Sequence, residues 1–162
     1  MRAQRMAASL FFAFVAAGPA QAQLAPTQDS TLRGLERVYV NLQNGGGALT
    51  PAQQAQALDF ITLELRKAGV RIAQAPSDLD LSKGALFNVA FMKVGSALST
   101  DLTLRIDVEQ AATLARTGSR LQMVTWFYED DRRNIAIDQV LQHMLRQGLD
   151  RFLNTWLTAN GR

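Results

Sequence analysis

The chain has no cysteine among its 162 residues. This absence excludes disulfide bonds and metal sites built on thiolates. It also excludes a lipid anchor, because lipid attachment at the start of an exported protein requires a cysteine. We therefore expect a protein that is free rather than tethered to a membrane by a lipid.

Histidine is almost as scarce, since His143 is the only one. Histidine is the usual proton carrier near neutral pH, but His143 falls on the polar side of a predicted helix. Nothing near it in the sequence completes a catalytic triad or a metal-ligand set. Ser96 and Ser99 lack the Gly-x-Ser-x-Gly turn of a serine hydrolase. We therefore predict no catalytic residue, no cofactor-binding residue and no metal site.

A concentrated run of one charge is also absent. The 17 lysines and arginines are interleaved with 14 aspartates and glutamates, whereas a nucleic-acid-binding surface usually shows a basic stripe. We therefore predict that nucleic acid is not a partner.

What the N-terminus does contain is the pattern of an export signal. Arg2 and Arg5 precede an apolar run over residues 6–15. The small residues Ala20 and Ala22 follow this run at the spacing that a signal peptidase accepts. The apolar run is shorter than the ~20 residues that cross a bilayer. We predict cleavage after Ala22, so that residues 1–22 are removed. The mature protein is then exported to the periplasm or the extracellular space, without a transmembrane segment.

The mature chain has the length of one domain. Residues 23–33 are predicted to be a flexible polar lead-in, and residues 34–160 a single domain. Hydrophobic periodicity predicts strands by alternation and helices by spacing of three and four residues. The predicted strands cover residues 35–42, 70–72, 85–94, 101–110 and 120–128, and the predicted helices cover residues 51–68 and residues from 134 onward.

A run of neighbouring strands with separate helices is typical of an α+β fold. We predict a two-layer sandwich in which a mainly antiparallel sheet of about four long strands carries two helices on one face. The order of elements is β-α-β-β-β-β-α, with a short second strand. Strand 101–110 alternates most clearly, with its apolar residues facing the core and Asp107 and Glu109 facing water.

Two groups of side chains are candidates for function. Asp107 and Glu109 share one face of a strand, as the two carboxylates of a glycosidase would, although alternating charges also serve simply to solubilise a strand. The run 126–128 is aromatic throughout and places rings on both faces of another strand. The helices either cover these rings or leave an apolar patch for a partner. The residues of this candidate partner surface are Tyr39, Phe91, Trp126 and Tyr128.

Three segments carry a resemblance to known proteins. At residues 63–72 (LELRKAGVRI), at Thr125 and Trp126, and at residues 152–160 (FLNTWLTAN), the chain resembles a family of uncharacterised short exported bacterial proteins. Its element order is similar to that of envelope-assembly α+β domains, namely the lipopolysaccharide-assembly lipoprotein and the N-terminal domain of the TolB type. The chain differs from that lipoprotein in having no cysteine to acylate.

These observations lead to one leading hypothesis and two alternatives. The leading hypothesis is an exported, non-enzymatic binding or assembly module of the bacterial cell envelope, with an envelope protein as its partner. The alternatives are a carrier of a small apolar ligand and a small carboxylate-based hydrolase that uses Asp107 and Glu109.

Overall fold

The computed structural model describes residues 28–80, 82–94, 101–134 and 136–162. The predicted signal peptide and its cleavage after Ala22 lie outside the described residues, as do Ser96 and Ser99. Within the described residues, no helix is long and apolar enough to cross a membrane.

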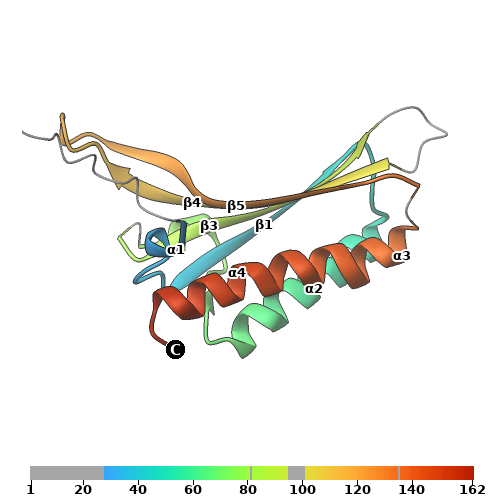
Figure 1. The fold of residues 1–162 in the computed structure, drawn as a ribbon, viewed down its shortest axis with the longest axis horizontal. Helices are drawn as coiled ribbons and strands as arrows, with labels where there is room; N and C mark the ends of the chain where they lie inside the picture. Colours follow the sequence, from blue (N-terminus) through green and yellow to red (C-terminus); the bar gives the residue numbers. More distant parts are fainter. Residues whose placement is uncertain (1–27, 81, 95–100, 135) are drawn as a thin grey trace, which may run out of the picture.

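A five-stranded sheet forms one layer of the protein (Figure 1). Its spatial order is β2-β1-β3-β4-β5. The first strand pairs in parallel with β2 and β3, and β4 pairs antiparallel with β3 and β5. The strands are β1 (Arg37–Gly45), β2 (Arg71–Ile72), β3 (Gly84–Val94), β4 (Asp101–Thr113) and β5 (Arg120–Arg132). The α+β class and the order of the main elements are confirmed, and the sheet is mixed because a helix connects β1 to its parallel neighbours.

That connecting helix is α2 (Pro51–Lys67). It begins with a capping box, in which the Thr50 hydroxyl accepts a hydrogen bond from the Gln53 amide at 3.3 Å and the Gln53 side chain accepts one from the Thr50 amide at 2.9 Å. It ends before Gly69, whose φ of +90° suits a residue without a side chain. The sequence therefore predicted the first residue of this helix correctly and its last residue to within one position.

The C-terminal helix has three consecutive parts, and begins at residue 137 rather than at residue 134 as predicted. They are α3 (Ile137–Gln139), a π-helical turn (Val140–Met144) and α4 (Leu145–Ala159). Asn134 has a φ of +51°, which is outside the right-handed helical region.

Both long helices cover the same face of the sheet, which we call the inner face (Figure 1). The ring of Phe152 on α4 contacts two aromatic rings of the sheet edge on, with centroids 4.8 Å from Phe87 and 5.3 Å from Trp126. A glycine lets α4 come close to the strands. A Cβ atom at Gly148 would lie only 2.6 Å from Ile106 Cδ1 and 2.9 Å from Tyr128 Cδ1.

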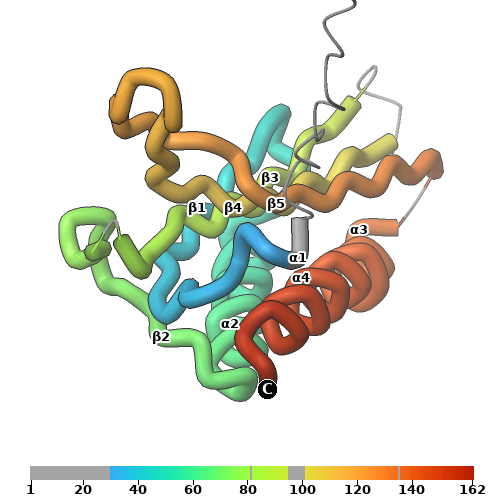
Figure 2. Tube along the Cα trace, turned by 60° about the vertical axis from the view of Figure 1, so that its left-hand side comes forward, coloured from blue at the N-terminus to red at the C-terminus, as the bar shows by residue number. Residues whose placement is uncertain are grey.

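The segment that precedes β1 is ordered where we expected a flexible lead-in. Gln28–Thr31 form a short helix, α1, and Leu32 is completely buried. Figure 2 shows α1 beside the end of α4. There the Asn160 side chain accepts a hydrogen bond from the Gly34 amide at 2.8 Å and donates one to the Leu32 carbonyl at 3.1 Å. The predicted lead-in is thus part of the packed domain from residue 28 onward.

At the β5 edge of the sheet, β4 and β5 run on past the other strands and past the two long helices (Figure 1). The pairing of β4 with β3 ends at Glu109, whereas its pairing with β5 continues to Thr113. We call residues 110–124, this two-stranded extension with its turn, the arm. A β-bulge separates the arm from the rest of the sheet, because Val108 pairs with Trp126 and Glu109 pairs with Val124, which leaves Thr125 as an extra residue.

Candidate functional site

The face of the sheet opposite the helices, which we call the outer face, carries rows of aligned side chains. The strand registers place one residue from each of four strands in each row. The three central rows are Tyr39, Leu86, Glu109 and Val124; then Asn41, Asn88, Asp107 and Phe127; and then Gln43, Ala90, Arg105 and Glu129.

The central row contains a polar network centred on Asn88. The Asn88 side-chain amide donates to Asp107 Oδ2 at 2.9 Å and to Glu109 Oε1 at 3.1 Å. Its carbonyl oxygen accepts a hydrogen bond from Asn41 at 3.0 Å. Arg105 Nε donates to the other Asp107 oxygen at 3.1 Å. One amide therefore holds two carboxylates together, and one arginine partly neutralises them.

The centre of this network is buried although no helix covers it. Asn88 and Asp107 are only 7% and 8% exposed, respectively. We predicted that Asp107 and Glu109 lie on the same face of a strand, and they do. We also predicted that Asp107 faces water, and this was wrong, because Asp107 is buried. Because buried polar groups cost free energy unless they are hydrogen-bonded, the Asn88 amide and Arg105 stabilise this arrangement. The two carboxylates are thus fixed by protein donors.

The predicted partner surface does not form, because three of its four aromatic residues lie in the core. Phe91, Trp126 and Tyr128 are 0%, 2% and 7% exposed on the inner face. Strict alternation would place Trp126 and Tyr128 on the same face as Val124. The bulge at Thr125 breaks the alternation of the strand and moves Val124 to the outer face. Of the four predicted residues, only Tyr39 lies on the outer face.

Sequence reasoning did not select Phe127, which is the aromatic residue that the structure exposes. Its side chain is 53% exposed and lies beside Asp107 in the central row of the outer face. The signal was present in the sequence, since three consecutive aromatic residues on a strand leave at least one ring on each face. Alternation alone did not say which face the helices cover.

The arm adds further exposed apolar side chains next to this face. Four apolar residues of the arm are between 40% and 45% exposed, namely Leu114, Leu121, Met123 and Val124. The arm also carries Arg116 and Arg120, both exposed. Exposed apolar and charged side chains therefore lie close together on the outer face and the arm.

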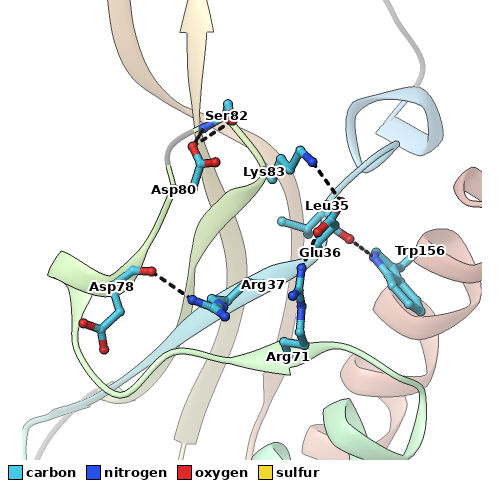
Figure 3. A network of polar contacts seen from close by, with 9 residues as sticks. All are labelled: Leu35, Glu36, Arg37, Arg71, Asp78, Asp80, Ser82, Lys83 and Trp156. Atoms are coloured by element: carbon cyan, nitrogen blue, oxygen red, sulfur yellow. Dashed lines mark hydrogen bonds and ion pairs between the residues drawn. The ribbon is translucent and has the colours of Figure 1, made fainter.

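A second polar network lies at the other end of β1 (Figure 3). The Glu36 carboxylate forms ion pairs with Arg71 and, at 3.5 Å, with Lys83. The adjacent Leu35 carbonyl accepts a hydrogen bond from Trp156 Nε1 at 2.8 Å. These contacts tie β1, β2 and α4 to one another, so we interpret this network as structural.

The nearby loop holds its own carboxylate in the charged form. The Asp80 side chain accepts hydrogen bonds from the Ser82 amide at 2.9 Å and from the Ser82 hydroxyl at 2.7 Å (Figure 3). The backbone hydrogen bond from Ser82 is the main reason that the pKa of Asp80 lies below its ordinary value. Asp80 is thus a turn-stabilising residue.

Metal-ligating side chains are not gathered in the part of the chain that the structure describes. No group of three or more histidine and carboxylate side chains there could hold a metal ion. His143 is exposed on the π-helical turn, on the helix layer and away from the carboxylates of the outer face.

Comparisons with known proteins give limited similarities. No protein-family model matches the chain, and neither does any curated protein. Among solved structures, the PelC dodecamer from Paraburkholderia phytofirmans matches at 16% identity and a TM-score of 0.44, over 72% of this chain and 86% of that one. The lipoprotein GNA1162 from Neisseria meningitidis matches at 12% identity and a TM-score of 0.36, over 74% of this chain and 97% of that one. A minor lipoprotein from Acinetobacter baumannii matches at 13% identity and a TM-score of 0.27, over 73% of this chain and 93% of that one. These values are low, so these proteins establish neither a family nor a function for the chain.

Proposed function

We propose that the mature chain is an exported, non-enzymatic binding or assembly module of the bacterial cell envelope, and that it holds a protein partner against the outer face of its sheet. One observation carries this proposal. Both long helices cover the inner face, while the outer face presents Phe127 at 53% exposure next to the buried Asn88 network.

The physical argument is that a large apolar ring and a fixed polar pattern suit recognition of a protein. Aromatic anchors contribute much of the binding energy at protein interfaces. The Asn88 network is held by four hydrogen bonds within the sheet, so its charges keep their positions before a partner arrives. A preorganised surface binds with a smaller loss of conformational freedom.

The same geometry argues against the carboxylate-based hydrolase. In such an enzyme, one carboxylic acid donates a proton to the substrate and the other carboxylate acts as a base or a nucleophile. Here both Asp107 oxygens accept hydrogen bonds from protein donors, and Asp107 is 8% exposed. A substrate would first have to displace Asn88 and Arg105.

The carrier of an apolar ligand is also less well supported. The depression lined by Glu36, Arg71, Trp156 and Arg162 has a volume of about 370 Å³ and is open to solvent. Charged groups line its rim, whereas carriers of apolar molecules enclose their ligand in an apolar cavity. Export itself stays a prediction from residues 1–22.

The test is capture of a partner from a cell-envelope extract with the chain from residue 23 to residue 162. Two variants with equally exposed apolar positions are compared, Phe127→Glu on the outer face and Leu63→Glu on helix α2, which are 53% and 51% exposed in the native protein. We expect capture of a specific protein by the native chain and by Leu63→Glu, and its loss in Phe127→Glu.

Three other results would contradict the proposal in different ways. Equal capture by both variants would place the binding surface elsewhere. Recovery of extractable lipid without protein would favour the carrier. Hydrolysis of an envelope polysaccharide that is lost in Asp107→Asn would favour the hydrolase.

A further inference from the structure

The arm is a part of the structure that its own fold does not stabilise fully. Beyond Glu109, β4 pairs only with β5, and the two long helices do not reach this far (Figures 1 and 2). The short helix α1 touches only the base of the arm, where the Thr31 hydroxyl donates to the Thr125 carbonyl at 2.9 Å. A two-stranded ribbon is marginally stable in water when nothing packs against it. The arm nevertheless extends to Thr113 and Arg120 before it turns.

Both faces of the arm carry exposed apolar residues. The register places Leu121 and Met123 on the continuation of the inner face and Val124 on the outer face, and each is 43% to 45% exposed. On one face, the neighbouring side chains of Leu121 and Met123 form an exposed apolar patch, and such a patch marks an interaction surface in a soluble protein. These side chains therefore need a covering surface.

Charge indicates what kind of surface this is. Between residues 110 and 124 the chain has no acidic residue, and it has two basic ones, Arg116 and Arg120. Both are exposed. In the described part of the chain neither lies within ion-pair distance of an acidic side chain, although the charge of Arg120 is a minor cause of the lowered pKa of Asp80. The arm is therefore apolar and positively charged.

The outer face of the sheet has the opposite character. Along β4 and β5 its side chains include Arg105 and four acidic residues, which are Asp107, Glu109, Glu129 and Asp131. Glu129 and Asp131 are exposed, and the large apolar ring of Phe127 lies in the row beside them. The outer face therefore offers negative charge and an apolar contact, as the arm requires.

We propose that the arm of one copy of this chain lies on the outer face of a second copy. Arg116 and Arg120 then lie near Glu129 and Asp131 of the second copy, and the apolar residues of the arm pack against its Phe127. This inference rests on the proposed function, because it names the occupant of the same face. Because the two surfaces differ, a repeated head-to-tail contact gives a ring or an open filament, whereas a mutual exchange of arms gives a two-fold dimer.

The first test is the oligomeric state of residues 23–162, measured by light scattering across a range of protein concentrations. We expect the native chain to self-associate, and salt to weaken the association because exposed charges contribute to it. The variant R116E/R120E should associate at least about tenfold more weakly. The matched control R66E/R151E changes the same number of exposed arginines on the helix layer and should associate like the native chain.

A mixing experiment tests which surfaces meet. The variant E129R/D131R has a basic outer face and a basic arm, so alone it should associate as weakly as R116E/R120E does. Mixed together, the acidic arm of one variant meets the basic outer face of the other. We expect a one-to-one complex in the mixture and not in either separate sample.

Other outcomes overturn the inference. A native chain that is monomeric at every concentration excludes a second copy as the occupant. If that monomer still captures an envelope protein in a way that depends on Phe127, the proposed function stands and only this inference fails. If the monomer instead floats with vesicles that contain anionic lipid, and R116E/R120E does not, the arm binds lipid. Self-association that the mixed variants do not restore assigns the contact to other surfaces.

Discussion

The two faces of strand β4 use buried residues in different ways. Its inner face presents Leu104, Ile106 and Val108, all completely buried beneath the helices. Its outer face presents Asp107, which is nearly as buried at 8% exposure although no helix covers it. On the inner face burial follows from packing, whereas on the outer face it follows from neighbouring side chains that also bind the carboxylate.

This difference shows where the stability and the recognition properties of the protein reside. The inner face is apolar, and burial of apolar area is the main source of folding free energy. The outer face holds a hydrogen-bonded network, whose net contribution to stability is small, while removal of one member leaves another unsatisfied. Substitutions on the two faces should therefore differ in size and in kind.

The largest effect is expected on the inner face, at Phe152. Its ring contacts Phe87 and Trp126, so Phe152→Ala removes the centre of an aromatic cluster and leaves a cavity. We expect the free energy of unfolding to fall by about 3–5 kcal/mol, measured by urea denaturation. Phe127→Ala is the control for ring removal on the outer face, and it should cost much less because Phe127 is 53% exposed. Equal losses would show that the outer face is as tightly packed as the inner one.

A smaller effect is expected where α4 approaches the sheet. Gly148→Ala introduces a Cβ atom 2.6 Å from Ile106 Cδ1 and 2.9 Å from the Tyr128 ring. Either the helix or the ring must shift, and overpacking of this kind costs about 1–3 kcal/mol. Gln147→Ala, at the exposed neighbouring position, should leave the melting temperature nearly unchanged. A native-like melting temperature for Gly148→Ala would mean that α4 is not held against the strands.

On the outer face, the comparison can be tested at Asn88. Asn88→Leu keeps the approximate size of the side chain but removes the donor that binds Asp107 and Glu109. We expect a loss of about 1–3 kcal/mol, because a buried carboxylate loses a hydrogen bond. Urea denaturation at neutral pH measures this loss. An unchanged free energy of unfolding would mean that the Asn88 amide does not stabilise the two carboxylates.

The sequence predicted those elements whose signals are local. Strand β4 alternates apolar and polar residues, and its inward set, including Leu104 and Ile106, is buried as expected. Helix α2 has its capping box at Thr50 and Gln53. Both signals act over a few residues, so one segment of the chain contains all the information that they need.

The features that the sequence did not predict depend on contacts between distant segments of the chain. The parallel pairing of β1 with β3 joins residues 37–45 to residues 84–92, and no local pattern specifies it. The bulge at Thr125 puts Val124 and Trp126 on opposite faces, whereas strict alternation, which assumes an uninterrupted strand, puts them on the same face. The Asn88 network escaped prediction for the same reason, since Asn88 and Asp107 meet only across two strands.

The smallest expected effect concerns Tyr128, at the border between the buried inner face and solvent. Its hydroxyl donates to Asp130 Oδ2 at 3.4 Å. Burial is the main cause that raises the pKa of Tyr128 above its ordinary value of 10.0, and the negative charge of Asp130 adds to it. The neutral phenol is therefore favoured in the folded state.

The sign of the pH dependence follows from this raised pKa. The stabilising contribution of Tyr128 is complete below pH 10, and it is lost as the pH rises from 10.0 through the higher pKa of the folded state, because the unfolded chain ionises first. The native protein should thus lose stability above pH 10 more steeply than Tyr128→Phe does. Thermal denaturation at several alkaline pH values measures the difference, and Tyr39→Phe on the outer face is the control. Parallel pH profiles for the native protein and Tyr128→Phe would show that the hydroxyl is as well solvated as in the unfolded chain.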